Sequence, residues 1–166
     1  MSKKLPNQKT ILISAGLAVT IVLGLVAAYL LNAGLLEKTS PETLNYDTIL
    51  PESKTADELG GWRRVSPPDK DPVFAYTDSI DGTRISVSQQ QLPDDFKSNP
   101  DGQVAELAGR FNATDKIEID DTTVHIGTSA QGPQSVILMK NNLLIMIKSE
   151  QKIDDKAWSD YIKTLN

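Results

Sequence analysis

The sequence predicts an α+β domain that follows an N-terminal transmembrane helix, and three observations carry this prediction. Ile11–Leu36 is a run of 26 residues without a charged side chain. Later segments alternate apolar and polar residues between turn residues, which is typical of antiparallel hairpins. Two other segments repeat apolar residues at helical spacing. We therefore expect an antiparallel sheet of about six strands and two packed helices, in the order β-β-α-β-β-β-β-α.

The apolar run is long enough to cross a membrane. A helix over Ile11–Leu36 would measure roughly 39 Å at about 1.5 Å per residue, and a bilayer core of about 30 Å needs about 20 apolar residues. The apolar part of a signal peptide is shorter, about 7–15 residues. The small pair Ala27-Ala28 resembles a cleavage site, so a cleaved signal peptide stays open as an alternative. We predict an uncleaved transmembrane helix.

The charges on either side of this run predict its orientation. Three lysines and no acid precede it, whereas all 22 acidic residues follow residue 36. The positive-inside rule then places the short N-terminal tail in the cytoplasm and the rest outside the cell membrane. We therefore expect a cytoplasmic tail, a transmembrane helix, an extracytoplasmic tether and an extracytoplasmic domain at residues 1–10, 11–36, 37–60 and 61–166.

Small residues recur every four positions along the apolar run, at Gly16, Thr20, Gly24 and Ala28. This spacing places small side chains on one face of a helix and lets a second helix approach closely. We expect self-association, or association with a membrane-protein partner, through this face. The alternative is that such residues are simply common in transmembrane helices.

The tether is expected to become part of the domain before residue 60. Ser40-Pro41 and Leu50-Pro51 favour extended or irregular backbone. Apolar residues among them are sufficient to fix part of this segment to the domain surface, namely Leu44, Tyr46, Ile49 and Leu50.

The clearest hairpin joins Val73–Ile80 to Thr83–Gln91. The dipeptide between them, Asp81-Gly82, is the strongest short-range signal for a two-residue hairpin turn, because both turn residues must accept a positive φ. Trp62–Val65, just before this hairpin, is a candidate short strand.

Two segments have helical spacing. The first carries apolar residues at i, i+3, i+4 and i+7, namely Val104, Leu107, Ala108 and Phe111. The second spans Asp154–Leu165, with Asp154 or Asp155 as its N-cap. Its expected buried face consists of Trp158, Tyr161, Ile162 and Leu165.

Two further hairpins lie between these helices. Ile117–Asp120 pairs with Thr123–Thr128, and Ser135–Lys140 pairs with Leu143–Ser149 through Asn141-Asn142. The last two strands are apolar on both faces, as in central strands of a sheet. We interpret Lys140 and Lys148 as charges that guard against edge pairing.

The composition excludes several kinds of chemistry. The chain has no cysteine, so disulfides, thiolate metal sites and cysteine nucleophiles are excluded. His125 is the only histidine, and its alternation with Val124 and Ile126 directs it away from the core. No sequence neighbour supplies a catalytic partner or a second zinc ligand. Residues 37–166 carry 14 basic and 22 acidic residues, a net charge of −8 that disfavours nucleic acid.

Paired carboxylates occur at three turns or helix starts, at Asp94-Asp95, Asp120-Asp121 and Asp154-Asp155. Aspartate is favoured at such positions by local bonds to the backbone. We expect no metal site, no cofactor and no catalytic residue.

The alternating strands and the closing helix resemble a group of small bacterial envelope domains of unknown function. The segments that carry the resemblance are Ile85–Gln90, Thr123–Ile126, Ser135–Ile137, Leu143–Ile147 and the tryptophan-containing helix. Members of this group are attached to single-pass anchors, lipoproteins or anti-sigma-factor regulators. The resemblance implies an extracytoplasmic antiparallel domain for sensing or binding, and it assigns no functional residue.

We therefore expect a non-enzymatic, membrane-anchored binding or interaction domain that belongs to an envelope complex. One alternative is a carrier or sensor of an apolar ligand, a lipid or a peptide, with a pocket lined by Val136–Met139 or Leu143–Ile147. A less favoured alternative is an envelope hydrolase, in which His125 would meet a carboxylate and a hydroxyl.

Overall fold

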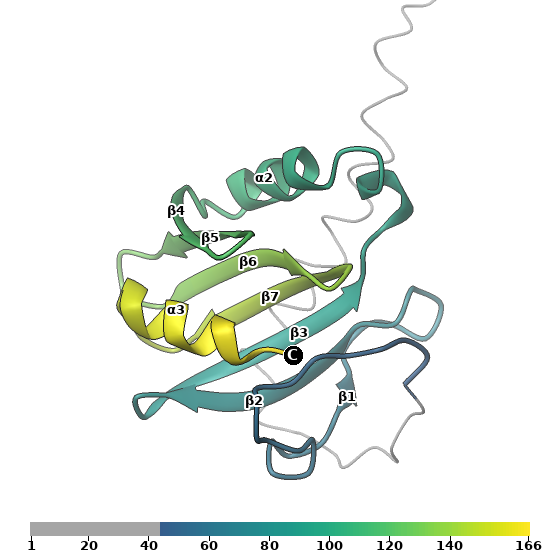
Figure 1. The fold of residues 1–166 in the computed structure, drawn as a ribbon, viewed down its shortest axis with the longest axis horizontal. Coiled ribbons are helices and arrows are strands. Elements are labelled where there is room, and N and C mark those ends of the chain that lie inside the picture. The colour runs from purple at the N-terminus through teal and green to yellow at the C-terminus, as the bar shows by residue number, and fades with distance from the viewer. Residues whose placement is uncertain (1–43) are drawn as a thin grey trace, which may run out of the picture. The chain divides into compact units, whose positions relative to one another are not determined.

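A computed structural model describes residues 44–166, which form an α+β domain built on one antiparallel sheet (Figure 1). Its strands are β1 (Arg63–Arg64), β2 (Phe74–Ile80), β3 (Thr83–Gln91), β4 (Asp115–Ile119), β5 (Thr122–Thr128), β6 (Gln134–Lys140) and β7 (Leu143–Ser149). Its helices are the 3₁₀ turn η2 (Asp94–Phe96), α2 (Pro100–Arg110) and α3 (Asp155–Thr164).

The sheet order is β1-β2-β3-β7-β6-β5-β4, and every neighbouring pair is antiparallel. The α+β class, the antiparallel sheet and the two α-helices within residues 44–166 confirm the prediction. The strand number is seven instead of six, because Arg63–Arg64 pairs with β2 and adds a short edge strand. The last strand in the sequence, β7, occupies the centre of the sheet, as its two apolar faces require.

Residues with positive φ close the hairpins. Asp81 and Gly82 have φ values of 49° and 80°, and Asn141 and Asn142 have values of 51° and 59°. The prediction for the β4–β5 turn was wrong by one residue. Ile119 pairs with Thr122, so Asp120-Asp121 forms the turn in place of Asp121-Thr122.

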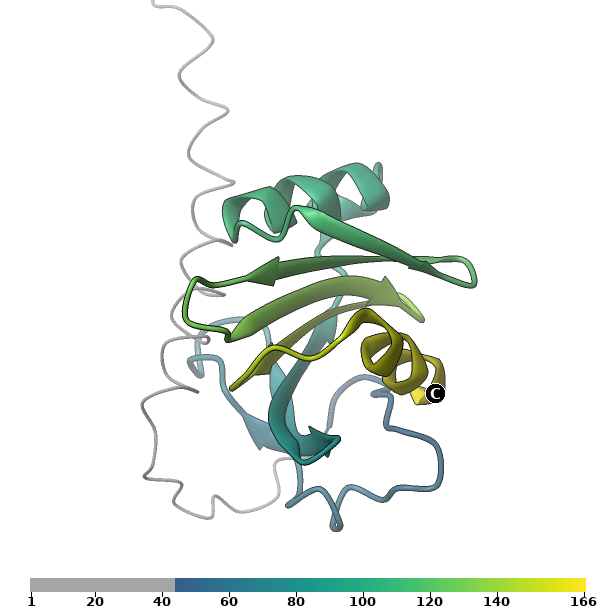
Figure 2. The ribbon, with the colours of Figure 1, turned by 90° about the vertical axis from the view of Figure 1, so that its left-hand side faces the viewer.

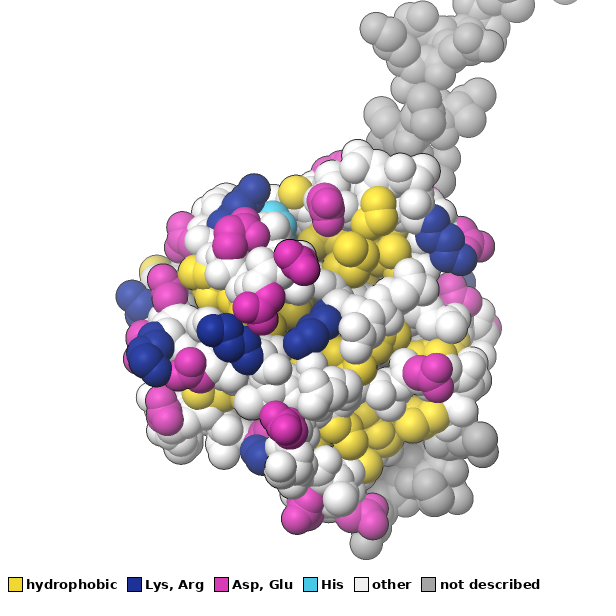
Figure 3. Space-filling view, viewed as in Figure 1, with side chains coloured by type: hydrophobic (Ala, Val, Ile, Leu, Met, Phe, Trp, Pro, Cys, Tyr) yellow, Lys and Arg dark blue, Asp and Glu magenta, His cyan; other side chains and the backbone are white. Residues whose placement is uncertain are grey.

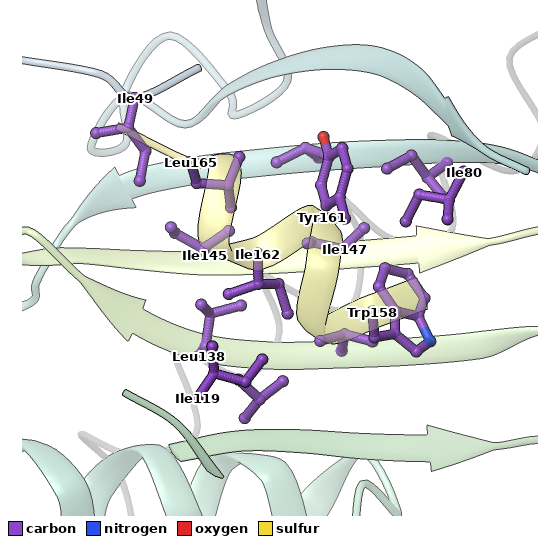
Figure 4. Close-up of a cluster of buried hydrophobic side chains, with 14 of the residues drawn as sticks. Ile49, Ile80, Ile119, Leu138, Ile145, Ile147, Trp158, Tyr161, Ile162 and Leu165 are labelled. Atoms are coloured by element: carbon purple, nitrogen blue, oxygen red, sulfur yellow. The ribbon is translucent and has the colours of Figure 1, made fainter. Parts of the chain in front are cut away.

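The main core lies between α3 and the sheet. Trp158 and Ile162 of α3 are at most 1% exposed and point toward alternate residues of the central strands, such as Ile145 and Ile147 (Figure 4). The predicted N-cap is confirmed, since the Asp154 carboxylate accepts a hydrogen bond from the Ala157 backbone N–H at 2.8 Å. We call this the α3 side of the sheet.

The opposite side, the α2 side, is only partly covered by a helix. α2 packs against β5 and β6, with Val104, Leu107 and Ala108 buried, and Figure 2 shows it well separated from α3. Gly127 of β5 permits the close approach of the segment that follows α2, because a Cβ there would lie 2.8 Å from the Asn112 carbonyl oxygen.

The N-terminal part of the described chain is fixed to the α3 side next to the C-terminus. The buried Gln89 side chain donates to the Ile49 carbonyl at 2.6 Å and accepts from the Ile49 N–H at 3.0 Å. Leu50 and Asn166 exchange two backbone hydrogen bonds of 3.0 and 2.9 Å. The end of the predicted tether therefore packs as an added strand-like segment.

Candidate functional site

The two sides of the sheet differ in charge. Cross-strand partners point to the same side and neighbours along a strand alternate, so the register assigns every strand residue to a side. Basic strand residues on the α2 side outnumber acidic ones by four to one: Arg63, Arg84, Lys116 and Lys148 against Glu118. On the α3 side the charged strand residues balance: Arg64 and Lys140 against Asp78 and Asp115. The positive side is notable in a chain with a net charge of −5.

A row of polar side chains crosses four neighbouring strands on the α2 side. Thr77 pairs with Ser86, Ser86 pairs with Lys148, and Lys148 pairs with Ser135. We call Thr77, Ser86, Lys148 and Ser135 the polar row. Directly opposite residues have Cβ atoms about 4.5–5.5 Å apart. The base of the Lys148 side chain is therefore flanked by a serine on each side.

Lys148 lies in the centre of the sheet. It is half-buried, and within residues 44–166 it makes no hydrogen bond or ion pair. Burial lowers the pKa of its ammonium group, because a charge loses solvation there. The interpretation of Lys140 and Lys148 as edge guards was wrong, since β6 and β7 both have strands on either side. The Lys140 ammonium group instead donates to the Ile162 carbonyl oxygen at 3.1 Å.

The Ser86 hydroxyl is buried and has no hydrogen-bond partner in the described structure. Its neighbour on the same side, Ser88, differs, because the Ser88 hydroxyl donates to the Met146 carbonyl oxygen at 3.1 Å. A buried polar atom without a partner costs about 1–3 kcal/mol. Such an atom next to an unpaired lysine calls for an explanation beyond packing.

Arg63 adds a second cation at the Thr77 end of the polar row. A Cβ built on Gly60 would lie 4.0 Å from both the Arg63 guanidinium and the Thr77 hydroxyl, so these two groups lie near one another. Arg63 is half-buried and makes no ion pair among the residues that the structure describes.

His125 is buried beneath α2, with 3% of its surface exposed. As expected, it points away from the main core that contains Val124 and Ile126, but a helix covers the α2 side of β5, so its side chain is buried there. Burial and then the charge of Lys116 lower the pKa of its imidazole, while Glu118 acts in the opposite direction. Glu118 accepts a hydrogen bond from the Thr123 hydroxyl at 2.9 Å, and His125 bonds to neither of them.

The α3 side carries a pair of buried tyrosine hydroxyls that join β2 to α3. The hydroxyls of Tyr76 and Tyr161 lie 3.3 Å apart, and burial raises the pKa of both. Asp78 lies on this side too, and its carboxylate forms an ion pair of 2.7 Å with Lys54. Acidic and basic side chains are interspersed over this side of the molecule (Figure 3).

The paired carboxylates remain at turns and helix starts. Asp120-Asp121 lies by a hollow of about 340 Å³ between two hairpin turns, and Asp154 lies by one of about 480 Å³ between α3 and the β2–β3 turn. Within residues 44–166 no three His, Asp or Glu side chains gather closely enough to hold a metal ion.

The predicted membrane helix and its small-residue face lie outside the described residues, as do Gly16, Thr20, Gly24 and Ala28. Among residues 44–166, no helix combines the length and the hydropathy that a membrane crossing requires.

Sequence reasoning missed the polar row. Alternation in β3 indicated that Ser86 faces away from the core, but Lys148 lies 62 positions further on. The two meet only because β7 inserts next to β3 in the sheet.

Comparisons with known proteins add no assignment. No protein-family model, curated protein or solved structure matches the chain. The resemblance to small envelope domains therefore stays a prediction from sequence pattern.

Proposed function

We propose that the protein is a single-pass, membrane-anchored binding protein whose C-terminal domain lies outside the cytoplasm and acts in an envelope complex without catalysis. The observation that carries the proposal is the excess of basic over acidic strand residues on the α2 side of an acidic domain, with Lys148 and Arg63 unpaired among the described residues. The anchor and its orientation rest on Ile11–Leu36 and the lysines that precede it.

Binding is favoured over hydrolysis by the geometry around the candidate nucleophiles. His125 makes no hydrogen bond to Thr123 or Glu118, so an activated hydroxyl lacks its base. Ser86 has a strand on either side, which commits the backbone N–H groups around it to the sheet. They are therefore not free to stabilise an oxyanion, which acyl transfer requires.

An apolar-ligand carrier has less support. On the α3 side, the apolar residues of the last hairpin already pack in the core with α3, among them Leu138, Ile145 and Ile147. Within the described residues, no apolar face of this hairpin is left open there for a ligand. On the α2 side, the middle of the sheet carries serines and a lysine beside the buried apolar residues Ile137, Leu144 and Met146, so its lining is mixed.

The proposal is tested by crosslinking the full-length protein in its native membrane, followed by capture and mass determination. We expect a bait of full mass together with one reproducible partner. A bait shortened by about 30 residues would show that the N-terminal run is a cleaved signal peptide. A full-length bait without any partner would overturn the complex.

The anchor's part in the complex is tested separately. Gly16→Leu with Gly24→Leu fills the small-residue face and is expected to dissociate the complex while leaving the domain folded. Ala18→Leu with Val22→Leu enlarges two side chains on the opposite side of the predicted helix, by fewer carbon atoms, and serves as the control. A complex that withstands the first pair would remove this face from the proposal.

A further inference from the structure

The polar row has the composition of an anion site. It presents one ammonium group and three hydroxyl groups from four adjacent strands, Thr77, Ser86, Lys148 and Ser135. All of these side chains can donate hydrogen bonds, and none carries a negative charge. Lysine with flanking hydroxyls is a common arrangement for a phosphate group, which offers several acceptor oxygens.

The surroundings leave the charge of Lys148 uncompensated. Its nearest acidic neighbour along the chain, Glu150, lies 3.8 Å from Arg84 and is engaged there. The Ser86 hydroxyl is buried and unsatisfied, although Ser88 shows that a serine on this strand can bond to a neighbouring carbonyl oxygen. An oxyanion at Lys148 would satisfy both groups, because it neutralises the ammonium charge and accepts a hydrogen bond from the Ser86 hydroxyl.

We propose that Lys148, Ser86 and Ser135 bind one oxyanion of the phosphate class, with Thr77 and Arg63 at the margin of the site. This inference rests on the proposed binding function and assigns the chemistry of the ligand. The phosphate group belongs either to a soluble ligand or to a lipid headgroup, since both present the same oxygens.

The site is tested with inorganic phosphate and the full-length protein in a neutral detergent, by calorimetric titration. We expect saturable binding that weakens about tenfold or more in Lys148→Met, because a charge-assisted hydrogen bond is lost. Ser86→Ala is expected to weaken binding by a smaller factor. Phosphate that does not bind the unaltered protein would overturn the site.

Lys116→Met is the matched control, because it removes the same charge from the same side of the sheet three strands away. Its phosphate affinity is expected to stay within about twofold of the unaltered protein, since a distant exposed charge is screened. An equal loss in Lys116→Met and Lys148→Met would show only a general positive potential and would overturn the inference.

The source of the phosphate is distinguished in nanodiscs. The affinity for inorganic phosphate is measured with the protein in phosphatidylglycerol and in phosphatidylcholine nanodiscs. A lower affinity in phosphatidylglycerol supports a lipid headgroup as the ligand, because the headgroup competes for the site. Equal affinity in both supports a soluble ligand.

The failure of this inference is distinguishable from the failure of the proposed function. A crosslinked partner recovered unchanged from Lys148→Met would uphold the binding function and place its interface elsewhere. Phosphate binding at Lys148 in a protein that captures no partner would uphold the site and overturn the complex.

Discussion

At the residue scale, Lys148 illustrates how a candidate binding residue opposes stability. Its ammonium group is partly desolvated without a partner, so its folded-state pKa is lowered and the charged form is disfavoured by folding. We predict that Lys148→Met increases the free energy of unfolding at neutral pH, because it removes a charge that burial disfavours. Urea unfolding measures this change, with the exposed Lys116→Met as a control that is expected to shift little. A destabilised Lys148→Met would contradict the account of Lys148 as an uncompensated charge.

His125 predicts a pH dependence of stability. Its folded-state pKa lies below the ordinary value of 6.5, mainly because it is buried. Below pH 6.5 the unfolded chain therefore binds a proton before the folded chain does, and stability falls as the pH falls through the folded pKa. We expect this loss to begin near pH 6.5 and to be absent in His125→Gln. Unfolding curves between pH 5 and pH 8 check it, and identical slopes in the two proteins would contradict it.

At the element scale, the sequence predicted those features that depend on local chemistry. Asp81-Gly82 and Asn141-Asn142 mark their turns because few residues accept positive φ. The apolar–polar alternation predicted the outer strands, and Asp154 predicted the start of α3. The two-residue strand β1 is too short to have a period, so its pairing with β2 was beyond prediction.

The candidate site was not predictable from sequence for a different reason. Strand order decides which residues become neighbours, and here β3 lies beside β7 with the whole of α2 and β4–β6 between them in sequence. Ser86 resembled an ordinary solvent-facing position of an alternating strand, and Ser135 stood at the start of a strand predicted to be apolar on both faces. Likewise, nothing local revealed that α2 would cover His125.

The packing of α2 gives a prediction at this scale. Gly127→Ala is expected to destabilise the domain by about 1–3 kcal/mol, because the added Cβ would lie 2.8 Å from the Asn112 carbonyl oxygen. Gly109→Ala is the control: nothing lies within 4 Å of its added Cβ, and alanine in a helix gains roughly 0.5–1 kcal/mol over glycine. Thermal unfolding compares the two, and a neutral Gly127→Ala would disprove the close approach.

At the scale of the whole molecule, a polar clamp joins the two ends of the described chain to the sheet. Gln89 is fully buried and bonds both backbone groups of Ile49, while Tyr46 donates to the Gln89 carbonyl at 2.5 Å. Burial raises the pKa of Tyr46 to about 12, which keeps this hydroxyl a donor at ordinary pH.

We predict that Gln89→Met lowers the free energy of unfolding by about 2–5 kcal/mol, because it leaves two buried backbone groups of Ile49 without partners. Gln91→Met, at the exposed end of the same strand, is expected to change little. Limited proteolysis should then cleave near residues 44–52 sooner in Gln89→Met than in the control. Equal cleavage in both proteins would show that the clamp does not fix this segment.

The clamp has a mechanical consequence. Tension between the N-terminal segment and the sheet acts first on Tyr46, which bonds to Gln89 of β3 and to Phe74 of β2, and then on the bonds of Ile49 to Gln89 and of Leu50 to Asn166. Once these bonds yield, residues 44–52 peel away from the sheet and release about 30 Å of extended chain, at roughly 3.4 Å per residue. The polar row lies on the other side of the sheet, so the domain extends its reach under load while its candidate ligand site keeps its shape.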